Sequence, residues 1–266
     1  FESNMPSQSL VILKIGGSVL TDEGAMPIAV REVSRYLASY DRVVAVVSAF
    51  KNQTDALQNK ALDRCPQPDP DTFAFYLGLG EMQTTTELAL ALQGAGVEAT
   101  ARMPWDVSFV CSGSPLDATP AAVNARAFRD AFRENRVVVF PGFIGCGADG
   151  RPNVLGRGGS DLTAIFLAAE LGAARCIMLK DVPGVFEWDP ARQGPRPRHF
   201  SKISWNDAAH LGGKWLRPGD VEYAHQRSVI IEIMAPETPG STAVGPDASQ
   251  LDPPGELGEL KRGSGG

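Results

Sequence analysis

The segment LGRGGSDLTA, at residues 155–164, holds the densest group of residues that could bind a charged ligand. Its three glycines, Gly158 among them, let a ligand approach the backbone closely. Arg157 offers a planar fork for a carboxylate or a phosphate, and Asp161 could hold lysines or organise a metal-bound nucleotide. Ser160 is a suitable N-cap for the apolar helix expected next. A capped helix with a chance salt bridge is the alternative explanation.

A second glycine-rich turn follows an apolar run near the N-terminus. In the sequence LKIGGSVLT, Lys14 precedes Gly16, Gly17 and Ser18. Backbone N–H groups in such a turn can bind phosphate oxygens, and a nearby lysine adds positive charge. The sequence is neither a Walker loop nor a G-x-G-x-x-G loop. A strand-to-loop turn with a solvated lysine therefore stays an alternative.

Two further segments carry polar residues where a ligand could bind. In SAFKNQTD, Ser48 and Thr54 follow a predicted strand, at the sheet edge where α/β proteins bind ligands. The same loop could instead cap the next helix. In LGLGEMQTTTELALAL, Glu81 lies among apolar neighbours, where a carboxylate is unfavourable unless it faces a cleft or a partner. A solvated helix face is the alternative for Glu81.

Two later segments suit a nucleotide and a phosphate. In LKDVPGVFEWDP, Lys180 and Asp181 end a predicted strand, and Phe186 and Asp189 follow a Pro-Gly turn. An acidic loop with an aromatic residue suits a nucleotide base and its ribose. In HLGGKWLRP, Lys214 follows a glycine pair. A second lysine on a glycine-flanked loop is what a phosphoryl-transfer site without a Walker loop would need.

Alternating strands and helices must position these residues. Runs rich in Val, Ile and Leu predict buried strands at 10–17, 42–49, 135–143, 175–182 and 228–234. Helices are expected between them, at 28–39, 72–95, 121–134, 160–171 and 204–212. This alternation indicates an α/β protein with a mostly parallel sheet between helical layers.

The remaining segments are expected to be loops and ends. Pro-rich, charged stretches predict surface loops at 59–72 and 189–201. A last strand is expected near 241–244, followed by a flexible tail at 246–266. Residues 1–9 are expected to be a flexible N-terminus, whose first four residues resemble a remnant of cloning and not a signal peptide.

Composition excludes several classes of function. The chain has 266 residues, 43% of them hydrophobic and 21% charged, with a net charge of −6 and no long basic stretch. These values indicate a globular protein and argue against a nucleic-acid-binding face. The four cysteines and three histidines have neither zinc-ligand nor disulfide-framework spacing. This cysteine pattern predicts a protein of the reducing cytoplasm. No apolar run approaches membrane-spanning length, so no membrane contact is expected.

Taken in order, these segments resemble the amino acid kinase superfamily and, within it, the aspartokinase branch. The motif K-x-G-G-[TS] corresponds to KIGGS, V-V-S-A to VVAVVSA, and a Gly-Glu helix to Glu81. The motif G-R-G-G-S-D-T-T-A corresponds to GRGGSDLTA, T-D-V-x-G-V-Y-x-x-D-P-R to KDVPGVFEWDPAR, and L-G-A-K-V-L-H-P to LGGKWLRP. The resemblance covers about residues 10–245. Its G-R-G-G-S-D element is specific, because uridylate, glutamate and acetylglutamate kinases have other sequences there.

The resemblance implies transfer of the γ-phosphoryl group of MgATP to a carboxylate, by resemblance the β-carboxylate of L-aspartate. The product would be 4-phospho-L-aspartate. The implied fold is the three-layer αβα sandwich of the superfamily. Its N-lobe, at about 10–150, would bind the amino acid, and its C-lobe, at about 151–245, the nucleotide. The catalytic positions correspond to Lys14, Asp161 and Lys214.

The other family positions form three groups. Those that bind phosphate correspond to Gly16, Gly17 and Ser18. Those that bind the amino acid, its carboxylate through an arginine and its ammonium through a glutamate, correspond to Ser48, Thr54, Glu81, Arg157, Gly158 and Ser160. Those that bind the nucleotide correspond to Lys180, Asp181, Phe186, Asp189 and Arg192. No residue is expected to hold a resident metal ion; Mg²⁺ would come with ATP.

Several positions depart from the family pattern. Lys180 replaces a threonine, Phe186 a tyrosine, Arg217 a histidine and Gly213 an alanine. Lys51 stands where many relatives have glycine or serine, and an extra cation near the acceptor could indicate a different acidic acceptor in a specialised pathway. A second alternative is a catalytically silent nucleotide-binding or sensory homologue.

The largest departure is in length. Most aspartokinases carry a C-terminal pair of ACT regulatory modules, and this chain ends where they would begin. Feedback inhibition through such modules is therefore not expected of this polypeptide. Association through the lobe surfaces, as in a homodimer, is the assembly that the resemblance leaves open.

Overall fold

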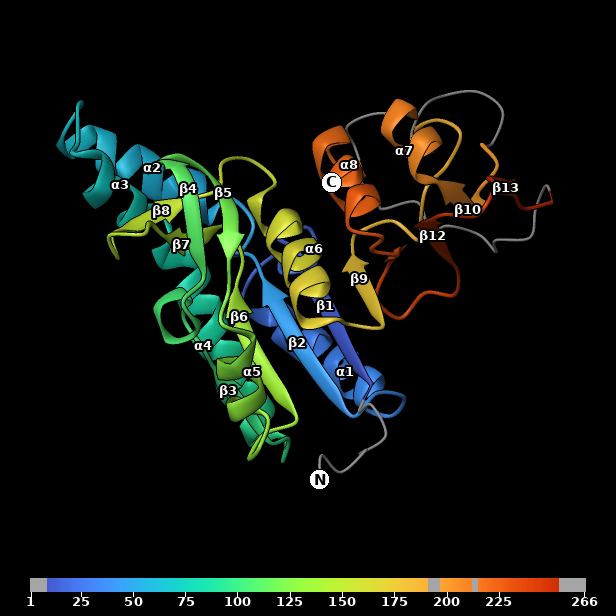
Figure 1. Ribbon diagram of the computed structural model, residues 1–266, viewed down its shortest axis with the longest axis horizontal. Coiled ribbons are helices and arrows are strands. Elements are labelled where there is room, and N and C mark those ends of the chain that lie inside the picture. Colours follow the sequence, from blue (N-terminus) through green and yellow to red (C-terminus); the bar gives the residue numbers. More distant parts are fainter. Residues whose placement is uncertain (1–8, 191–196, 212–214, 254–266) are drawn as a thin grey trace.

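A large, mostly parallel sheet forms the centre of the molecule (Figure 1). The computed structural model describes residues 9–190, 197–211 and 215–253. In these ranges the main sheet has the strand order β13-β10-β12-β11-β9-β1-β2-β6-β3. Its strands are β1 (Leu10–Ile15), β2 (Arg42–Val47), β3 (Ala99–Ala101), β6 (Val137–Pro141), β9 (Arg175–Leu179), β10 (Phe200–Ser204), β11 (Ile231–Met234), β12 (Ser241–Gly245) and β13 (Gln250–Leu251). Among the described strands of this main sheet, only β12 on β11 and β13 on β10 pair antiparallel.

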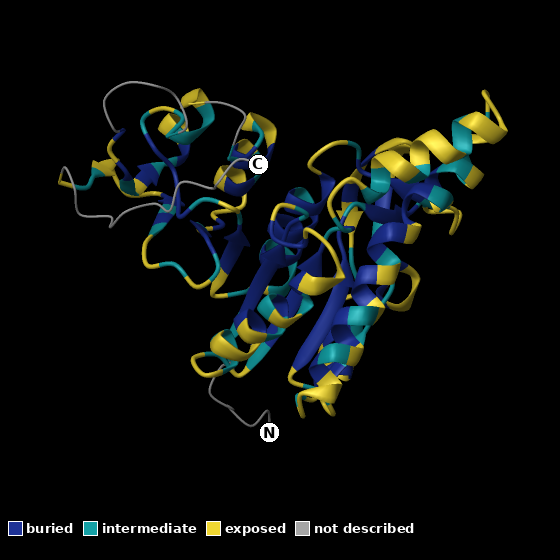
Figure 2. Ribbon diagram, turned by 180° about the vertical axis from the view of Figure 1, so that it is seen from behind, coloured by how far each residue is buried: buried dark blue, intermediate teal, exposed yellow. Residues whose placement is uncertain are grey.

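Helices cover both faces of this sheet, because successive strand residues point to opposite faces and nearly all are apolar. Val11 and Leu13 of β1 pack with α1 (Met26–Leu37) and α4 (Leu79–Gly94). Ile12 points to the opposite face and packs with α6 (Gly159–Leu171). Figure 2 shows the strands buried and the outer helix faces exposed. The predicted αβα sandwich is confirmed.

A second, smaller sheet is formed by four further strands. Its order is β5-β4-β7-β8, with β4 (Val110–Ser114), β5 (Asp117–Ala122), β7 (Ile144–Cys146) and β8 (Pro152–Val154). The remaining elements are the helices α2 (Gln53–Arg64), α3 (Pro70–Leu77), α5 (Ala125–Ala131), α7 (Trp205–Leu211) and α8 (Pro218–Gln226), and the 3-10 turns η1 (Glu23–Ala25) and η2 (Pro104–Val107). Across the described ranges, no helix combines the length and apolar character needed to cross a bilayer.

The expected strands of the main sheet are confirmed. The expected helices are also confirmed, although two of them differ in extent, one predicted loop is partly helical, and α8 was not expected. The helix predicted at 72–95 is two helices that meet at Gly78, where a Cβ would lie 2.3 Å from the Ile144 side chain. The loop predicted at 59–72 is wrong in its first part, because α2 continues to Arg64. The helix predicted at 121–134 is the shorter α5, preceded by the end of β5.

The C-terminal part is also more regular than expected. Phe200–Ser204, at the end of the predicted loop 189–201, forms β10. Gln250–Leu251 pairs with β10, although a flexible tail was expected from residue 246 onward. The predicted strand near 241–244 is confirmed as β12. Residues 254–266 lie outside the described part of the chain.

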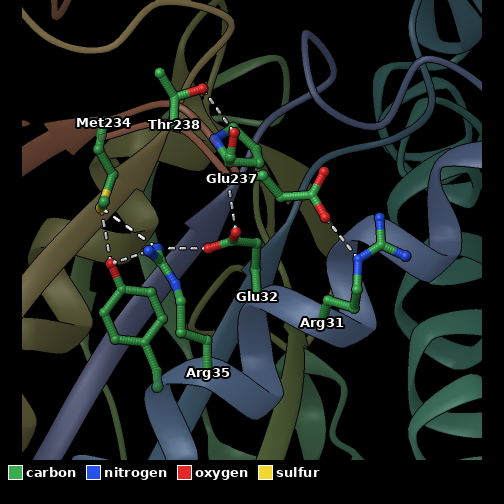
Figure 3. Close-up of polar contacts among 8 residues, drawn as sticks. Arg31, Glu32, Arg35, Met234, Glu237 and Thr238 are labelled. Atoms are coloured by element: carbon green, nitrogen blue, oxygen red, sulfur yellow. Dashed lines mark hydrogen bonds and ion pairs between the residues drawn. The ribbon is translucent and has the colours of Figure 1, made fainter. Parts of the chain in front are cut away.

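A polar cluster fastens α1 to the chain that follows β11 (Figure 3). Glu32, only 2% exposed, accepts hydrogen bonds from the Arg35 guanidinium at 2.6 Å and from the Glu237 backbone N–H at 3.0 Å. The Tyr36 hydroxyl donates to the Met234 sulfur at 2.8 Å. Because β11 pairs with β9, this cluster supports the same edge of the sheet at which β9 ends.

Candidate active site

Two lysines and an aspartate meet where β1 and β9 end. β1 and β9 are parallel neighbours, with Lys14 paired to Met178. Lys14 lies on the same strand face as Ile12, and Lys180 on the same face as Met178, so both lysines point toward α6. Asp161, in the first turn of α6, contacts Lys14 Nζ through Oδ1 and Lys180 Nζ through Oδ2, each at 2.7 Å.

Burial makes the charges of this cluster interact strongly. Lys14 is 5% exposed and Asp161 8%. Burial by itself raises the pKa of Asp161, but the charges of Lys14 and Lys180 outweigh it and lower that pKa to about 2. Burial lowers the pKa of Lys14, attraction by Asp161 opposes this shift, and repulsion by Lys180 adds to it. The site therefore has two amines around one carboxylate that stays ionised at neutral pH.

The glycine loop before α6 brings a further ion pair close to the cluster. Gly158 has a φ of 76°, in the left-handed region that favours glycine, and α6 begins at the next residue. A Cβ at Gly158 would lie 2.6 Å from Arg217 Nε. Arg217 is paired with the buried Asp220 at 2.8 Å. The sequence identified Arg217 only as a departure from the family, and its place beside this loop depends on the packing of α8 against α6.

A cavity of about 560 Å³ opens beside the lysine–aspartate cluster. It is lined by residues from β1, the loop after β2, α2, α3, α4 and the glycine loop. Nine of the residues predicted from the sequence line it: Lys14, Gly17, Ser48, Thr54, Glu81, Arg157, Gly158, Ser160 and Asp161. The segments singled out for their chemistry thus converge on one cavity.

Glu81 is buried against this cavity and is not on a solvated helix face. It is 3% exposed, and burial raises its pKa to about 7, although the Ala49 backbone N–H partly opposes this shift. Its Oε2 atom has no hydrogen-bond partner among the described residues. Gly80 permits this burial, because a Cβ there would lie 2.8 Å from Ala49 Cβ. A buried carboxylate with an unused oxygen can accept a cationic ligand group.

The cavity also has an apolar wall that the sequence did not identify. It is formed by Phe73, Leu77, Leu116, Phe143 and Val154. Phe73 and Leu77 are four residues apart on α3, a spacing that would equally suit ordinary core packing. The cationic side chain of Lys51 lines the same cavity.

Several predicted site residues do not line this cavity. Gly16 is still close, since a Cβ there would lie 2.8 Å from Lys14 Nζ. Phe186 is 3% exposed and packs edge-on against His199, with ring centroids 5.2 Å apart. Lys180 contacts Asp161, as described above. The others outside the lining are Ser18, Asp181 and Asp189, while Arg192 and Lys214 lie outside the described residues.

The described residues form no protein cage for a metal ion. Within the described ranges, no group of three or more His, Cys, Asp or Glu side chains is arranged to hold one. Both oxygens of Asp161 already contact lysines. Mg²⁺ in kinase sites is bound mainly through substrate phosphates and one or two carboxylates.

Comparison with known proteins agrees with this arrangement. Residues 9–234 match the sequence profile of the Amino acid kinase family. Aspartokinase from Mycolicibacterium smegmatis is 34% identical over 244 residues, which are 89% of this chain but 58% of that protein. The chain thus spans less than two thirds of this curated relative.

Solved structures give the same result. Aspartate kinase from Synechocystis matches with a TM-score of 0.76 and 28% identity, over 91% of this chain and 40% of that one. Aspartokinase III from E. coli, in complex with aspartate and ADP, shares the fold, with a TM-score of 0.73 and 22% identity over 90% of this chain and 65% of that one. From its profile, its fold and the convergence of its motifs on one cavity, the chain belongs to the amino acid kinase family.

Proposed function

We propose that this chain catalyses ATP-dependent phosphorylation of an amino-acid side-chain carboxylate, with L-aspartate as acceptor and 4-phospho-L-aspartate and ADP as products. The observation that carries this proposal is the buried Lys14–Asp161–Lys180 cluster, which borders a cavity lined by Arg157 and Glu81. The cluster offers positive charge for a phosphoryl group, and the cavity offers opposite charges for the two ends of an amino acid.

This chemistry needs cations more than it needs a base. A carboxylate with a pKa near 4 is already ionised at neutral pH. One of its oxygens attacks the γ-phosphorus, the bond to the β–γ bridging oxygen breaks, and ADP leaves with the electron pair. Repulsion between two anions is the obstacle, so catalysis is mainly positioning and charge neutralisation. Lys14 and Lys214 are proposed to flank the transferring group.

The acceptor is proposed to bind between Arg157 and Glu81. The Arg157 guanidinium can hold the α-carboxylate through two hydrogen bonds, and the unused Oε2 of Glu81 can accept one from the α-ammonium. Further contacts with the acceptor are proposed for four other residues that line the cavity: Ser48, Thr54, Gly158 and Ser160. E. coli aspartokinase III, which shares this fold, was solved with aspartate and ADP.

The nucleotide is proposed to bind over the segment after β9, with Mg²⁺ on its phosphates. Backbone N–H groups of Gly16, Gly17 and Ser18 would donate to phosphate oxygens. Base and ribose contacts are proposed from Asp181, Asp189 and Arg192. The Phe186 ring, which the resemblance also placed in this group, is buried against His199 and is not proposed as a base contact. In this proposal the N-lobe, at about residues 10–150, binds the amino acid, and the C-lobe, at about residues 151–245, binds the nucleotide. A cytoplasmic location and a homodimer stay predictions.

A different acidic acceptor is the second candidate function. It is supported by Lys51 and the apolar wall from Phe73 and Leu77, which line the same cavity and exceed what aspartate requires. Initial rates with ATP and a panel of amino acids, with hydroxylamine to trap acyl phosphates, test both candidates. The proposal predicts a hydroxamate from aspartate. A hydroxamate only from another acid would select the second candidate, and none from any acid would overturn both.

A further inference from the structure

We propose that Lys180 binds the phosphate chain of the nucleotide and not its base or ribose. Asp161 holds the Lys180 side chain beside Lys14, so that Lys180 is a further cation at the site of phosphoryl transfer (the transfer centre). This inference rests on the proposed function and assigns to it a residue that the sequence associated with the nucleotide only in general terms.

The backbone places Lys180 at the same sheet edge as Lys14. Lys180 directly follows β9, and the register of β1 and β9 aligns it with the turn at Gly16. Its backbone N–H donates to the Met234 carbonyl at 2.9 Å, which fixes the strand end. Its side chain points toward α6 and contacts Asp161 Oδ2 at 2.7 Å. Lys180 therefore approaches the transfer centre from β9, while Lys14 approaches it from β1.

The charges around Asp161 show why a second lysine matters. Lys14 and Asp161 alone would form a neutral pair, so Lys180 supplies the excess positive charge while both lysines are protonated. Asp220 on α8 also attracts Lys14, but it is paired with Arg217, so this pair adds no net charge to the cluster. A buried excess charge is unfavourable until a counter-ion binds. A phosphate chain is a counter-ion that the proposed reaction supplies.

Lys180 also has free donors with which to bind it. A lysine ammonium has three N–H donors, and Asp161 is the one hydrogen-bond partner of Lys180 Nζ among the described residues. The Lys180 side chain is 16% exposed, compared with 7% for Lys14, so part of it is open to solvent. During transfer, the electron pair of the breaking P–O bond passes to the β-phosphate of ADP. An ammonium at these oxygens stabilises that charge and exchanges no proton.

Substitution of Lys180 separates a phosphate contact from a base contact. Lys180→Met keeps side-chain length without charge, Lys180→Gln gives the same comparison if the methionine variant folds poorly, and Lys180→Arg keeps the charge. Lys202→Met, at an exposed lysine of β10, is the matched control. Calorimetry of the full chain with ATP and with adenosine measures binding, and the hydroxamate rate measures turnover.

We expect Lys180→Met to weaken ATP binding by about 10- to 100-fold, as for loss of a hydrogen bond to a charged group, and to leave adenosine binding unchanged. The value of kcat should fall at least as far, with partial recovery in Lys180→Arg and none of these effects in Lys202→Met. Equal weakening of ATP and adenosine, or normal ATP binding and normal kcat, would overturn the inference. Wild-type protein that binds ATP and phosphorylates no acid would overturn the proposed function alone, while the ATP–adenosine comparison would still decide the role of Lys180.

Discussion

At the scale of single residues, the site depends on charges that are buried and unequally paired. Asp161 has a lysine on each oxygen, whereas Glu81 has an oxygen with no partner among the described residues. The pKa of Asp161 is lowered to about 2, and that of Glu81 is raised to about 7. Asp161 is therefore suited to hold cations permanently, and Glu81 to gain its charge when a cationic ligand arrives.

The raised pKa of Glu81 predicts a pH dependence of acceptor binding. As the pH falls through about 7, Glu81 becomes protonated and loses its attraction for an ammonium, so the KM for the amino acid should rise. At pH 8, Glu81→Gln should have a KM for the amino acid about 10-fold or more above that of the wild type, as expected for loss of a charged hydrogen bond. The KM of this variant should change little as the pH is lowered. The measurement is kcat/KM for the acceptor against pH at saturating ATP.

Glu87→Gln is the control, because Glu87 lies on the same helix and does not line the cavity. Its profile should follow that of the wild type. An unchanged pH profile in Glu81→Gln would contradict the assigned contact.

At the scale of elements, the five central strands β11, β9, β1, β2 and β6 were predictable because their apolar runs are covered on both faces, whereas β3, β10 and β13 of the same sheet were not predicted. The small sheet was not predicted, since β7 and β8 have only three residues each and show no usable period. The motif segments could be recognised from their residue types and their order along the chain, but the contact between Lys180 and Asp161 could not. This contact depends on β9 lying beside β1, a pairing between distant segments that no local pattern encodes.

The backbone conformation and close packing of the loop that leads into α6 require glycine at position 158. Gly158→Ala would combine a strained φ of 76° with a Cβ 2.6 Å from Arg217 Nε, so it should displace Arg217 from Asp220 and lower activity at least 10-fold. Gly172→Ala is a matched control at the other end of α6, because its φ is 63° but nothing lies within 4 Å of its Cβ.

Gly172→Ala should lose about 1 kcal/mol of unfolding free energy and keep its activity. Gly158→Ala should lose unfolding free energy and also lose activity. Urea unfolding and the hydroxamate assay measure the two effects. Full activity in Gly158→Ala would show that the close approach of Arg217 is not required.

At the scale of the whole molecule, the site is built at one edge of the main sheet, and contacts far from the cavity hold that edge together. The cluster of Glu32, Arg35, Tyr36, Met234 and Glu237 connects α1 to the chain after β11 (Figure 3). The Met234 carbonyl in turn accepts the backbone N–H of Lys180. The fold thus connects the outer helix α1 to the lysine–aspartate cluster through β11 and β9.

Glu32→Ala should therefore destabilise the protein more than loss of a surface ion pair does. It leaves the Glu237 N–H without its acceptor, and the expected loss is about 2 kcal/mol of unfolding free energy. Asp130→Ala, which removes the half-exposed pairs with Arg126 and Arg133, is the control and should lose less than about 1 kcal/mol. Denaturant unfolding measures the unfolding free energies of the two variants. Equal losses in both would show that the cluster does not stabilise the contact between α1 and the chain after β11.

The central claim is that a carboxylate oxygen of the acceptor attacks the γ-phosphorus of ATP. The most direct test uses aspartate with ¹⁸O in its β-carboxylate, and MgATP. Hydroxylamine cleaves the acyl phosphate at carbon, so the released phosphate retains the bridging oxygen, which ³¹P NMR detects by its isotope shift. Our proposal predicts one ¹⁸O atom in this phosphate and an equal amount of aspartyl hydroxamate. Phosphate without ¹⁸O, released as ATP is consumed, would mean that water is the nucleophile and would contradict the claim.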